Sequence, residues 1–339
     1  MKRITLKDLA KKLNLSVATV SRALADGPNI RPETKERVLK AAEEMNYKPN
    51  SIATHLRTGR TGAIGVVVDE MITPFVAQAL RGIQRVLHPE GISILIACSY
   101  NDPAQEIRNL QMMEEAQVDG LMVFPCHDTG DTEIYRRLAD KNIPVVFVGK
   151  SPGDISASEI ATDHHSKVYF LVDHLVRTGR TKVAHVTGDN PSPYFNLLRN
   201  AFAEALARHS LAADPDLVVG AKPTFEGGVA AVDELRRRGK DFDSVFAAAD
   251  LQAIGVMNRL LEKGVHIPDD VAVAGYAGSY LSKMVFPQLT TVEPPLVEMG
   301  EKAAHLILEK INNPSTPDRI LRVDAKILLR HSTHGPGSQ

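Results

Sequence analysis

The sequence predicts a small all-helical domain at the N-terminus, followed by an α/β core of two lobes that each contain a doubly wound parallel sheet. At 339 residues the chain exceeds one typical domain. Its first sixty residues hold 13 Lys and Arg against 6 Asp and Glu, whereas the remainder holds 27 against 35. From residue 62 onward, short apolar runs alternate with helical patterns, which is typical of parallel sheets covered by helices on both faces.

The composition favours packed domains over disorder or a fibre, because 43% of residues are hydrophobic and 24% are charged. No apolar run reaches the roughly 20 residues of a membrane helix. The N-terminal segment shows neither an apolar signal region nor a cleavage site, so we predict a cytoplasmic protein without membrane contact. Cys98 and Cys126 lie in apolar segments and are interpreted as buried free thiols rather than as a disulfide.

Two short helices are predicted at the start of the chain. Thr5 precedes apolar residues at helical spacing and is followed three positions later by Asp8, which is a variant of the capping box. A tight connection leads to Ser16, whose hydroxyl can cap a second helix, and Asp26-Gly27-Pro28 ends that helix.

The second helix has a polar side that suits DNA. Val20, Ala23 and Leu24 share one face, which leaves Val17, Ala18, Ser21 and Arg22 on the opposite face. In a helix-turn-helix, the second helix enters the major groove. There an arginine can bind guanine and small apolar side chains can touch a thymine methyl. The alternative is a three-helix bundle with a solvated polar face.

A third helix is predicted over 32–45, with Pro32 in its first turn. A short basic linker follows and leads into the core. The predicted core strands are 64–68, 93–97, 120–124, 145–148, 183–187, 217–219, 244–247 and 271–274. The predicted core helices are 74–87, 104–115, 133–141, 167–178, 196–209, 227–238 and 252–263. Two parallel sheets of this length favour a ligand cleft at the carboxyl ends of their strands.

The sequence contains little that would indicate a catalytic site or a metal site. The glycines of Gly59-x-x-Gly62-x-x-Gly65 precede the first strand, so they are not a dinucleotide fingerprint, and no Walker phosphate loop occurs. The adjacent His164 and His165 lack partners at metal-ligand spacing and are interpreted as solvent-exposed or capping residues. We therefore expect no enzyme activity, no metal and no cofactor.

With these features the chain resembles the lac repressor/galactose repressor family of bacterial transcription regulators. The resemblance extends along essentially the whole chain. The most specific motifs lie in the head: Thr5-Leu6-x-Asp8-Leu9-Ala10, Leu15-Ser16-x-Ala18-Thr19-Val20-Ser21-Arg22-Ala23-Leu24, Asn46-Tyr47-x-Pro49-Asn50 and Leu56-Arg57.

The resemblance implies a homodimeric repressor that binds a pseudo-palindromic operator. It also implies that Leu56 wedges into the minor groove from a hinge helix that folds on DNA. The residues that it implies in DNA binding are Thr5, Leu6, Ser16, Val17, Ala18, Thr19, Ser21, Arg22, Asn29, Thr34, Tyr47, Asn50, Ala53, Leu56 and Arg57. The expected domains are a helix-turn-helix at 1–48, a hinge helix and linker at 49–61, the core at 62–332 and a tail at 333–339.

The core resembles the family's sensor, which is built like a periplasmic sugar-binding protein. Lobe 1 is expected at about 62–161 and 291–322, and lobe 2 at about 162–290 and 323–332. The family implies that two chains associate through lobe 1, for which we predict its helices over 74–87 and 104–115. A ligand that favours one lobe closure would shift the population of folded hinge helices.

The resemblance breaks down in the cleft. Leu198, Pro223, Ala249 and Ala277 stand where relatives place an arginine, an aromatic residue, an asparagine and an aspartate. Apolar side chains cannot replace those hydrogen bonds. The effector is then a less polar molecule, a sugar or sugar phosphate held by other groups, or absent. The candidate lining residues, for which lobe packing or solvation is the alternative, are Thr73, Phe75, His127, Asp163, Tyr194, Asn196, Leu198, Arg199, Asp250, Tyr276 and Ala277.

Two other classes of protein remain. A secreted solute-binding protein shares such a core but needs a signal peptide and has no use for the head. A nucleotide-dependent enzyme shares the α/β architecture but needs the phosphate loop that is missing.

Overall fold

The computed structural model describes residues 4–24, 30–45, 47, 60–71, 74–126, 131–153, 155–189 and 192–334. The chain divides into two compact units, Met1–Gly62 and Ala63–Gln339. The first is called the head and the second the core. The predicted combination of an all-helical head with a two-lobed α/β core is confirmed.

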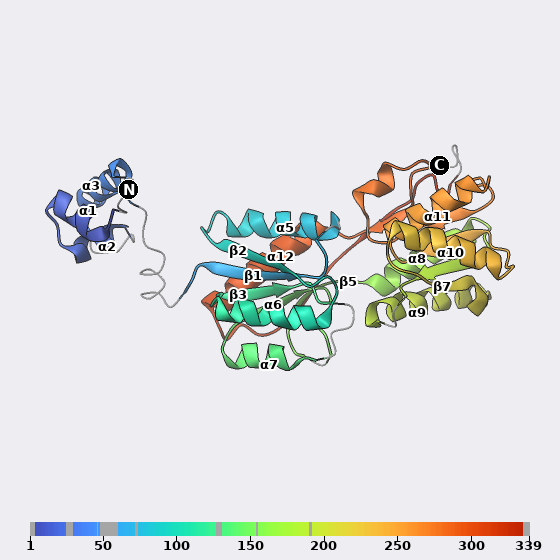
Figure 1. Ribbon diagram of the computed structural model, residues 1–339, viewed down its shortest axis with the longest axis horizontal. Coiled ribbons are helices and arrows are strands. Elements are labelled where there is room, and N and C mark those ends of the chain that lie inside the picture. Colours follow the sequence, from blue (N-terminus) through green and yellow to red (C-terminus); the bar gives the residue numbers. More distant parts are fainter. Residues whose placement is uncertain are drawn as a thin grey trace. The chain divides into compact units, whose positions relative to one another are not determined.

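The described residues of the head form three helices (Figure 1). The predicted capping box is confirmed, because the Asp8 N–H donates to Thr5 Oγ1 at 3.3 Å while the Thr5 N–H donates to Asp8 Oδ2 at 2.9 Å. Ser16 Oγ likewise accepts from the Thr19 N–H at 3.0 Å and caps the second helix. Leu9, Val20 and Val38, one from each helix, are fully buried together. The helices are α1 (Leu6–Leu13), α2 (Val17–Leu24) and α3 (Pro32–Glu44).

Lobe 1 is a six-stranded parallel sheet with the order β11-β5-β4-β3-β1-β2. Its strands are β1 (Ala63–Val68), β2 (Ser93–Cys98), β3 (Gly120–Val123), β4 (Val145–Val148), β5 (Ser158–Thr162) and β11 (Ile320–Val323). Its helices are α5 (Pro74–Leu87), α6 (Pro103–Glu115), α7 (Glu133–Asp140) and α12 (Leu296–Asn312). Ile64, Val66 and Val68 pack with α5 and α12, whereas Val67 packs with α6 and α7, so helices cover both faces (Figure 1).

Lobe 2 repeats this architecture with a four-stranded parallel sheet in the order β7-β6-β8-β9. Helices α8 and α9 share one hydrophobic cluster, and α10 and α11 share the other. The strands are β6 (Val183–Thr187), β7 (Val218–Gly220), β8 (Ser244–Ala247) and β9 (Ala272–Ala274). The helices are α8 (His164–Arg177), α9 (Pro193–Arg208), α10 (Phe225–Arg237), α11 (Asp250–Glu262) and the 3₁₀ turns η1 (Pro215–Leu217) and η2 (Tyr280–Lys283).

The chain passes between the lobes three times, after β5, after β10 and after β11. Strand β10 (Thr291–Glu293) pairs antiparallel with β12 (Lys326–Leu328). Val292 and Ile327 of this pair pack into the hydrophobic core of lobe 2. Beyond β10 the chain enters α12 of lobe 1, so β10 is a crossover strand.

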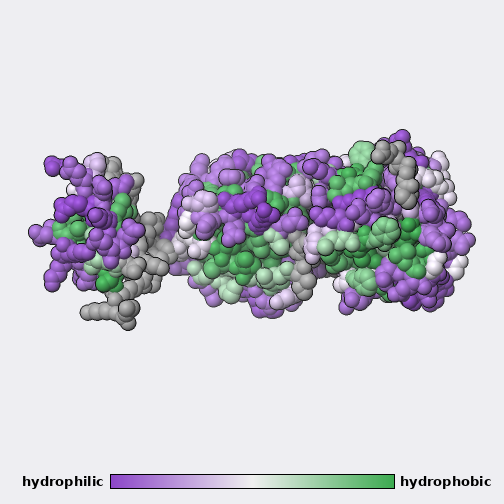
Figure 2. Space-filling model, turned by 90° about the horizontal axis from the view of Figure 1, so that it is seen from above, coloured by the Kyte–Doolittle hydropathy of each residue, from purple (hydrophilic) through white to green (hydrophobic). Residues whose placement is uncertain are grey.

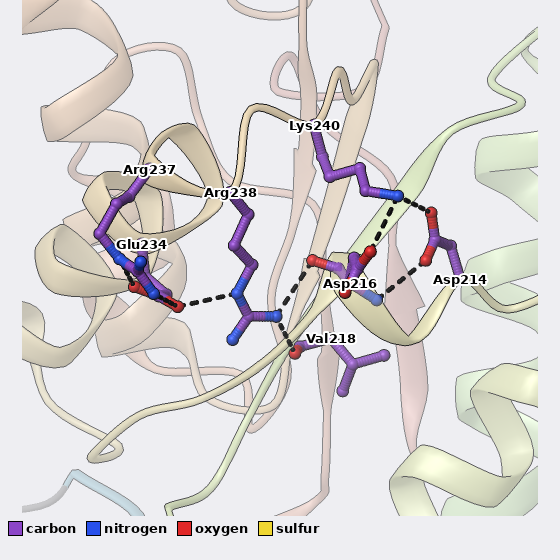
Figure 3. Close-up of polar contacts among 7 residues, drawn as sticks. All are labelled: Asp214, Asp216, Val218, Glu234, Arg237, Arg238 and Lys240. Atoms are coloured by element: carbon purple, nitrogen blue, oxygen red, sulfur yellow. Dashed lines mark hydrogen bonds and ion pairs between the residues drawn. The ribbon is translucent and has the colours of Figure 1, made fainter.

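A network of ion pairs and hydrogen bonds lies at the β7 edge of lobe 2 (Figure 3). Arg238 Nη1 donates to the Val218 carbonyl at 3.0 Å, while its Nε donates to Glu234 at 2.8 Å. Lys240 contacts Asp214 at 3.2 Å and Asp216 at 2.9 Å. Hydrogen bonds from Arg237 and Arg238 lower the pKa of Glu234 to about 2. The network joins the C-terminal end of α10 to the turn that leads into β7.

Most predicted elements occur within a few residues of their expected bounds, but five α-helices and strands of the described residues were not predicted. These are β5, β10, α12, β11 and β12. Among the described helices, none is both long and apolar enough to cross a membrane. Within the same residues, no three His, Cys, Asp or Glu side chains are grouped so that they could hold a metal ion.

Candidate nucleic-acid interface and effector site

Helix α2 separates a buried side from an exposed side. Val20 and Ala23 are buried in the head, whereas Val17, Ala18 and Arg22 are exposed. The side chain of Val17, the first residue of α2, is 41% exposed. The exposed side therefore offers a cation and two small apolar groups, which is the chemistry that reads base edges in a major groove.

The remaining described head candidates have structural contacts as well. Ser16 and Thr19 share a hydrogen bond between their hydroxyls at 2.8 Å at the start of α2. Leu6 and Tyr47 are half-buried and pack against the head's hydrophobic core. Thr5 caps α1, and Ser21 and Thr34 are half-buried on their helices. The candidates Asn29, Asn50, Ala53, Leu56 and Arg57 lie outside the described residues.

The basic side chains of the head lie on its surface. Lys12 forms an ion pair with Glu44 at 2.9 Å and thereby joins α1 to α3. The exposed lysines and arginines of the described head are Lys7, Lys11, Lys12, Arg22, Arg31, Arg37, Lys40 and Arg60. Surface cations that outnumber the carboxylates attract a polyanion.

Acidic and aromatic side chains follow the strands of both lobes. Asp69 comes directly after β1 in lobe 1, and burial raises its pKa to about 7. Tyr194, at the start of α9 in lobe 2, has a pKa raised by burial and then by the charges of Asp250 and Asp69. Carboxylates from the two lobes therefore act on one phenol. Asp69 was missed at the sequence level, although an acid that directly follows an apolar strand was a readable signal.

The interpretation of both adjacent histidines as solvent-exposed or capping is right for His165 and wrong for His164. His165 is 48% exposed and pairs with Glu204 at 2.9 Å, as expected. His164 is half-buried instead, with Nδ1 2.8 Å from the Tyr276 hydroxyl and its ring edge-on to Tyr194 at 5.4 Å. Burial lowers the pKa of His164 to about 4, so the ring is neutral at pH 7. The adjacent pair is separated because successive helical side chains point in different directions.

Asp250 is the first residue of α11 and only 2% exposed. Its Oδ1 accepts a hydrogen bond from Thr291 Oγ1 at 2.6 Å, and its Oδ2 accepts from the Ser279 N–H at 2.6 Å. Burial raises its pKa to about 7. This carboxylate is engaged by the chain itself.

The other effector candidates are dispersed. Leu198 is fully buried in the core of lobe 2, whereas Arg199 is exposed and donates to Asn196 at 2.7 Å. Tyr276 is 1% exposed and Ala277 has a positive φ of 102°.

Asp163 caps α8 by accepting from the Ser166 N–H, and Phe75 packs edge-on against Phe124. Thr73 and His127 lie outside the described residues. The structure thus groups Tyr276 with His164 and Tyr194, and leaves Leu198 in the core.

Comparison with known families gives matches to two separate parts of the chain. The family described as "Bacterial regulatory proteins, lacI family" matches residues 5–50, which include α1, α2 and α3. A "Periplasmic binding protein-like domain" matches residues 172–333, which include most of lobe 2 and the chain's return to lobe 1.

Similar proteins match the chain over nearly its full length. Catabolite control protein A of Priestia megaterium is 27% identical over 331 residues, which are 97% of this chain and 99% of that relative. The transcriptional regulator CelR, solved in complex with cellobiose, has a TM-score of 0.74 at 27% identity and covers 97% of this chain and 100% of its own. The lac repressor dimer bound to operator and the anti-inducer ONPF has a TM-score of 0.87 at 21% identity, covers 98% of this chain and 99% of its own, and supports the fold alone. The chain thus combines a head that matches the lacI family of bacterial regulatory proteins with a core that matches a periplasmic binding protein-like domain, and it is similar over nearly its whole length to regulators of transcription.

Proposed function

We propose that this chain is a repressor that binds a pseudo-palindromic operator as a homodimer, under the control of a small-molecule effector bound at the strand ends of its two lobes. The observation that carries the proposal is the exposed side of α2 on a basic head. Two such heads at a fixed separation complement two successive major grooves of a duplex. The protein regulates transcription and does not catalyse a reaction.

Within the head, α2 enters the major groove. Arg22 binds a guanine through O6 and N7, and Val17 and Ala18 contact a thymine methyl. The segment 49–61 then acts as a hinge in which Leu56 wedges between base steps of the minor groove. The cost of unstacking, roughly a few kcal/mol, is offset by the additional contacts that the bent duplex makes.

The dimer is supported by exposed apolar side chains on lobe 1. Leu95 and Ile96 are 39% and 43% exposed on β2, which is an edge strand of the sheet. Met112 of α6 is 49% exposed. Figure 2 shows hydrophobic surface on the face of lobe 1 that is visible from above. Contact between two copies removes this surface from water and covers the edge strand. The helices α5 and α6 join that interface.

The effector site is formed by Tyr194, His164, Asp163 and Arg199 of lobe 2 with Phe75 of lobe 1. CelR was solved with cellobiose, which is a disaccharide. In this chain Leu198, Ala249 and Ala277 stand at positions where the family resemblance implies polar residues that hold the effector. We infer a ligand that makes fewer hydrogen bonds to lobe 2 than a sugar makes. A thermal-shift screen of sugars, sugar phosphates and nucleosides identifies it, because a ligand of the folded state raises the melting temperature.

The DNA-binding proposal is tested by selecting duplexes from a random pool with the full-length protein. We expect a pseudo-palindrome of two half-sites. The variant Leu56→Ala then weakens binding to that site at least tenfold and leaves the melting temperature of the core unchanged, because Leu56 acts on DNA alone. Leu39→Ala is the matched control, since Leu39 is 46% exposed on α3 of the same head.

Two results contradict the proposal at different levels. Unaltered operator affinity in Leu56→Ala removes the minor-groove wedge while leaving the repressor. Equal and weak binding to all duplexes, with no preferred site recovered, removes sequence-specific regulation itself.

A further inference from the structure

Asp250 holds two segments of lobe 2 together through one buried carboxylate. Its two oxygens accept from Thr291 Oγ1 and from the Ser279 N–H, both at 2.6 Å. Thr291 belongs to the crossover strand β10, and Ser279 ends the loop of residues 275–279 that follows β9. The charged groups that act on the carboxylate are Arg330 of the C-terminal segment, which favours ionisation, and Glu293 of β10, which opposes it.

The 275–279 loop lies against the crossover strand along its whole length. The Gly275 N–H donates to the Thr290 carbonyl at 2.9 Å, and the Ala277 N–H donates to the Val292 carbonyl at 3.2 Å. A Cβ on Gly278 would lie 2.5 Å from Glu293 Cα, so the two backbones are in direct contact. The positive φ of Ala277 is a conformation that L side chains rarely adopt, and these contacts keep it in place.

The Asp250 carboxylate also leaves no room for a side chain at position 275 of the loop. A Cβ on Gly275 would lie 2.4 Å from Asp250 Oδ1. The backbone N–H of Asp250 also donates to the Tyr276 carbonyl at 2.8 Å. The first residue of α11 is therefore hydrogen-bonded to the 275–279 loop. Burying an acid costs free energy unless its hydrogen bonds are satisfied, and here both oxygens are engaged.

We propose that Asp250 is a positioning residue that couples the 275–279 loop to the crossover strand β10, so that a ligand contact with this loop is passed to lobe 1. The inference rests on the proposed effector control of the regulator. Tyr276 brings the loop to His164 and Tyr194, two of the proposed effector residues. At the other end, Glu293 is followed by Pro294 and Pro295, which lead into α12 of lobe 1. Asp250 itself does not contact the ligand.

The coupling is first tested without DNA or ligand. Hydrogen exchange of the full chain is measured for wild type, Asp250→Ala and Thr291→Val. We expect the peptides that contain 275–279 and 290–295 to lose protection together, at least tenfold, while β6 and β8 keep theirs. Asp233→Asn is the matched control, because Asp233 pairs with Arg259 on the surface of the same lobe. Loss of protection in only one of the two segments, or in neither, overturns the proposal.

Rescue by conservative variants separates positioning from general stability. Asp250→Asn can still accept from Ser279 and donate to Thr291, and Thr291→Ser keeps the hydroxyl, so both should restore protection and operator affinity to within threefold of wild type. Thr291→Val is nearly isosteric and should change operator affinity at least fivefold. Equal operator affinities for Thr291→Val and Thr291→Ser contradict the transmission. If the wild type selects no operator, the repressor proposal fails while the exchange experiment still decides the coupling.

Discussion

At the scale of single residues, His185 shows how a polar group is accommodated in the core of lobe 2. The ring lies on β6 and stacks against both Phe202 and Phe246, each at 4.9 Å between centroids. Nδ1 is 3.0 Å from the Phe246 carbonyl and must donate to it, whereas Nε2 is buried and has no hydrogen-bond partner among the described residues. Burial lowers the pKa of His185 to about 4. The folded protein therefore keeps this ring neutral.

The consequence is a loss of stability in acid. Because the pKa of His185 is lower in the folded state than the unfolded value of 6.5, the unfolded chain takes up the proton first. The stabilisation is complete above pH 6.5 and is lost as the pH falls toward 4, by on the order of 3 kcal/mol for a shift of this size. His185→Phe should flatten that part of the profile in urea unfolding followed from pH 7 to 4. His165→Phe is the exposed control, and an unchanged slope in His185→Phe would argue against the buried neutral ring.

At the scale of elements, the contact between α5 and α12 depends on two glycines. A Cβ on Gly82 would lie 2.0 Å from the Val297 carbonyl oxygen, and a Cβ on Gly300 would lie 2.1 Å from the Ala79 carbonyl oxygen. The helices thus approach backbone to backbone, and Arg85 pairs with Glu301 at 3.1 Å beside the contact. This interface joins an early helix of lobe 1 to one that arrives more than two hundred residues later.

Gly82→Ala should therefore destabilise the core. In an ordinary helix this change is favourable by roughly 0.5–1 kcal/mol, because alanine has less backbone entropy to lose. Here the added methyl meets a carbonyl of α12, and we expect a net cost of about 1–3 kcal/mol, as for other overpacked sites. Chemical denaturation measures the effect, with the exposed Gln84→Ala in the same helix as control. A Gly82→Ala protein as stable as wild type would mean that the two helices can separate freely.

The elements also show which features the sequence could predict. The head helices followed from local chemistry, since Thr5, Asp8 and Ser16 cap their own helices. Strand β5, Ser158–Thr162, lacks a continuous apolar run and becomes a strand because β4 and β11 pair with it. Helix α12 was missed although Leu296, Met299, Ala303 and Ile307 recur at helical spacing. The burial of His164 and Leu198 depends on tertiary packing. It could not be predicted, because nothing in their sequence neighbourhood distinguishes a residue that lines a pocket from one in the core.

At the scale of the whole molecule, the charges are divided between head and core, with net values of +7 for the first sixty residues and −8 for the rest. Counterion release makes binding by such a head steeply dependent on salt. Raising KCl from 50 to 200 mM should weaken operator binding by roughly 10³- to 10⁵-fold if each dimer makes about 6–10 phosphate contacts.

Arg22→Ala distinguishes base reading from phosphate binding in that experiment. If Arg22 reads a base, its loss costs about 1–3 kcal/mol and relaxes the preference at one position of each half-site, while the salt slope stays the same. Fluorescence anisotropy with the selected operator and with variants of it measures both quantities. A shallower salt slope with unchanged sequence preference would assign Arg22 to phosphate instead.

The three passages of the chain between the lobes also dictate the order of assembly during synthesis. Strand β11 and helix α12, which complete the sheet and one helical layer of lobe 1, end at Val323 and Asn312 of a 339-residue chain. Neither lobe is then a contiguous stretch that can mature as it leaves the ribosome. The head can fold early, but the sheet of lobe 1 is complete only when the ribosome has released Val323, about 260 residues after the first strand of that sheet began.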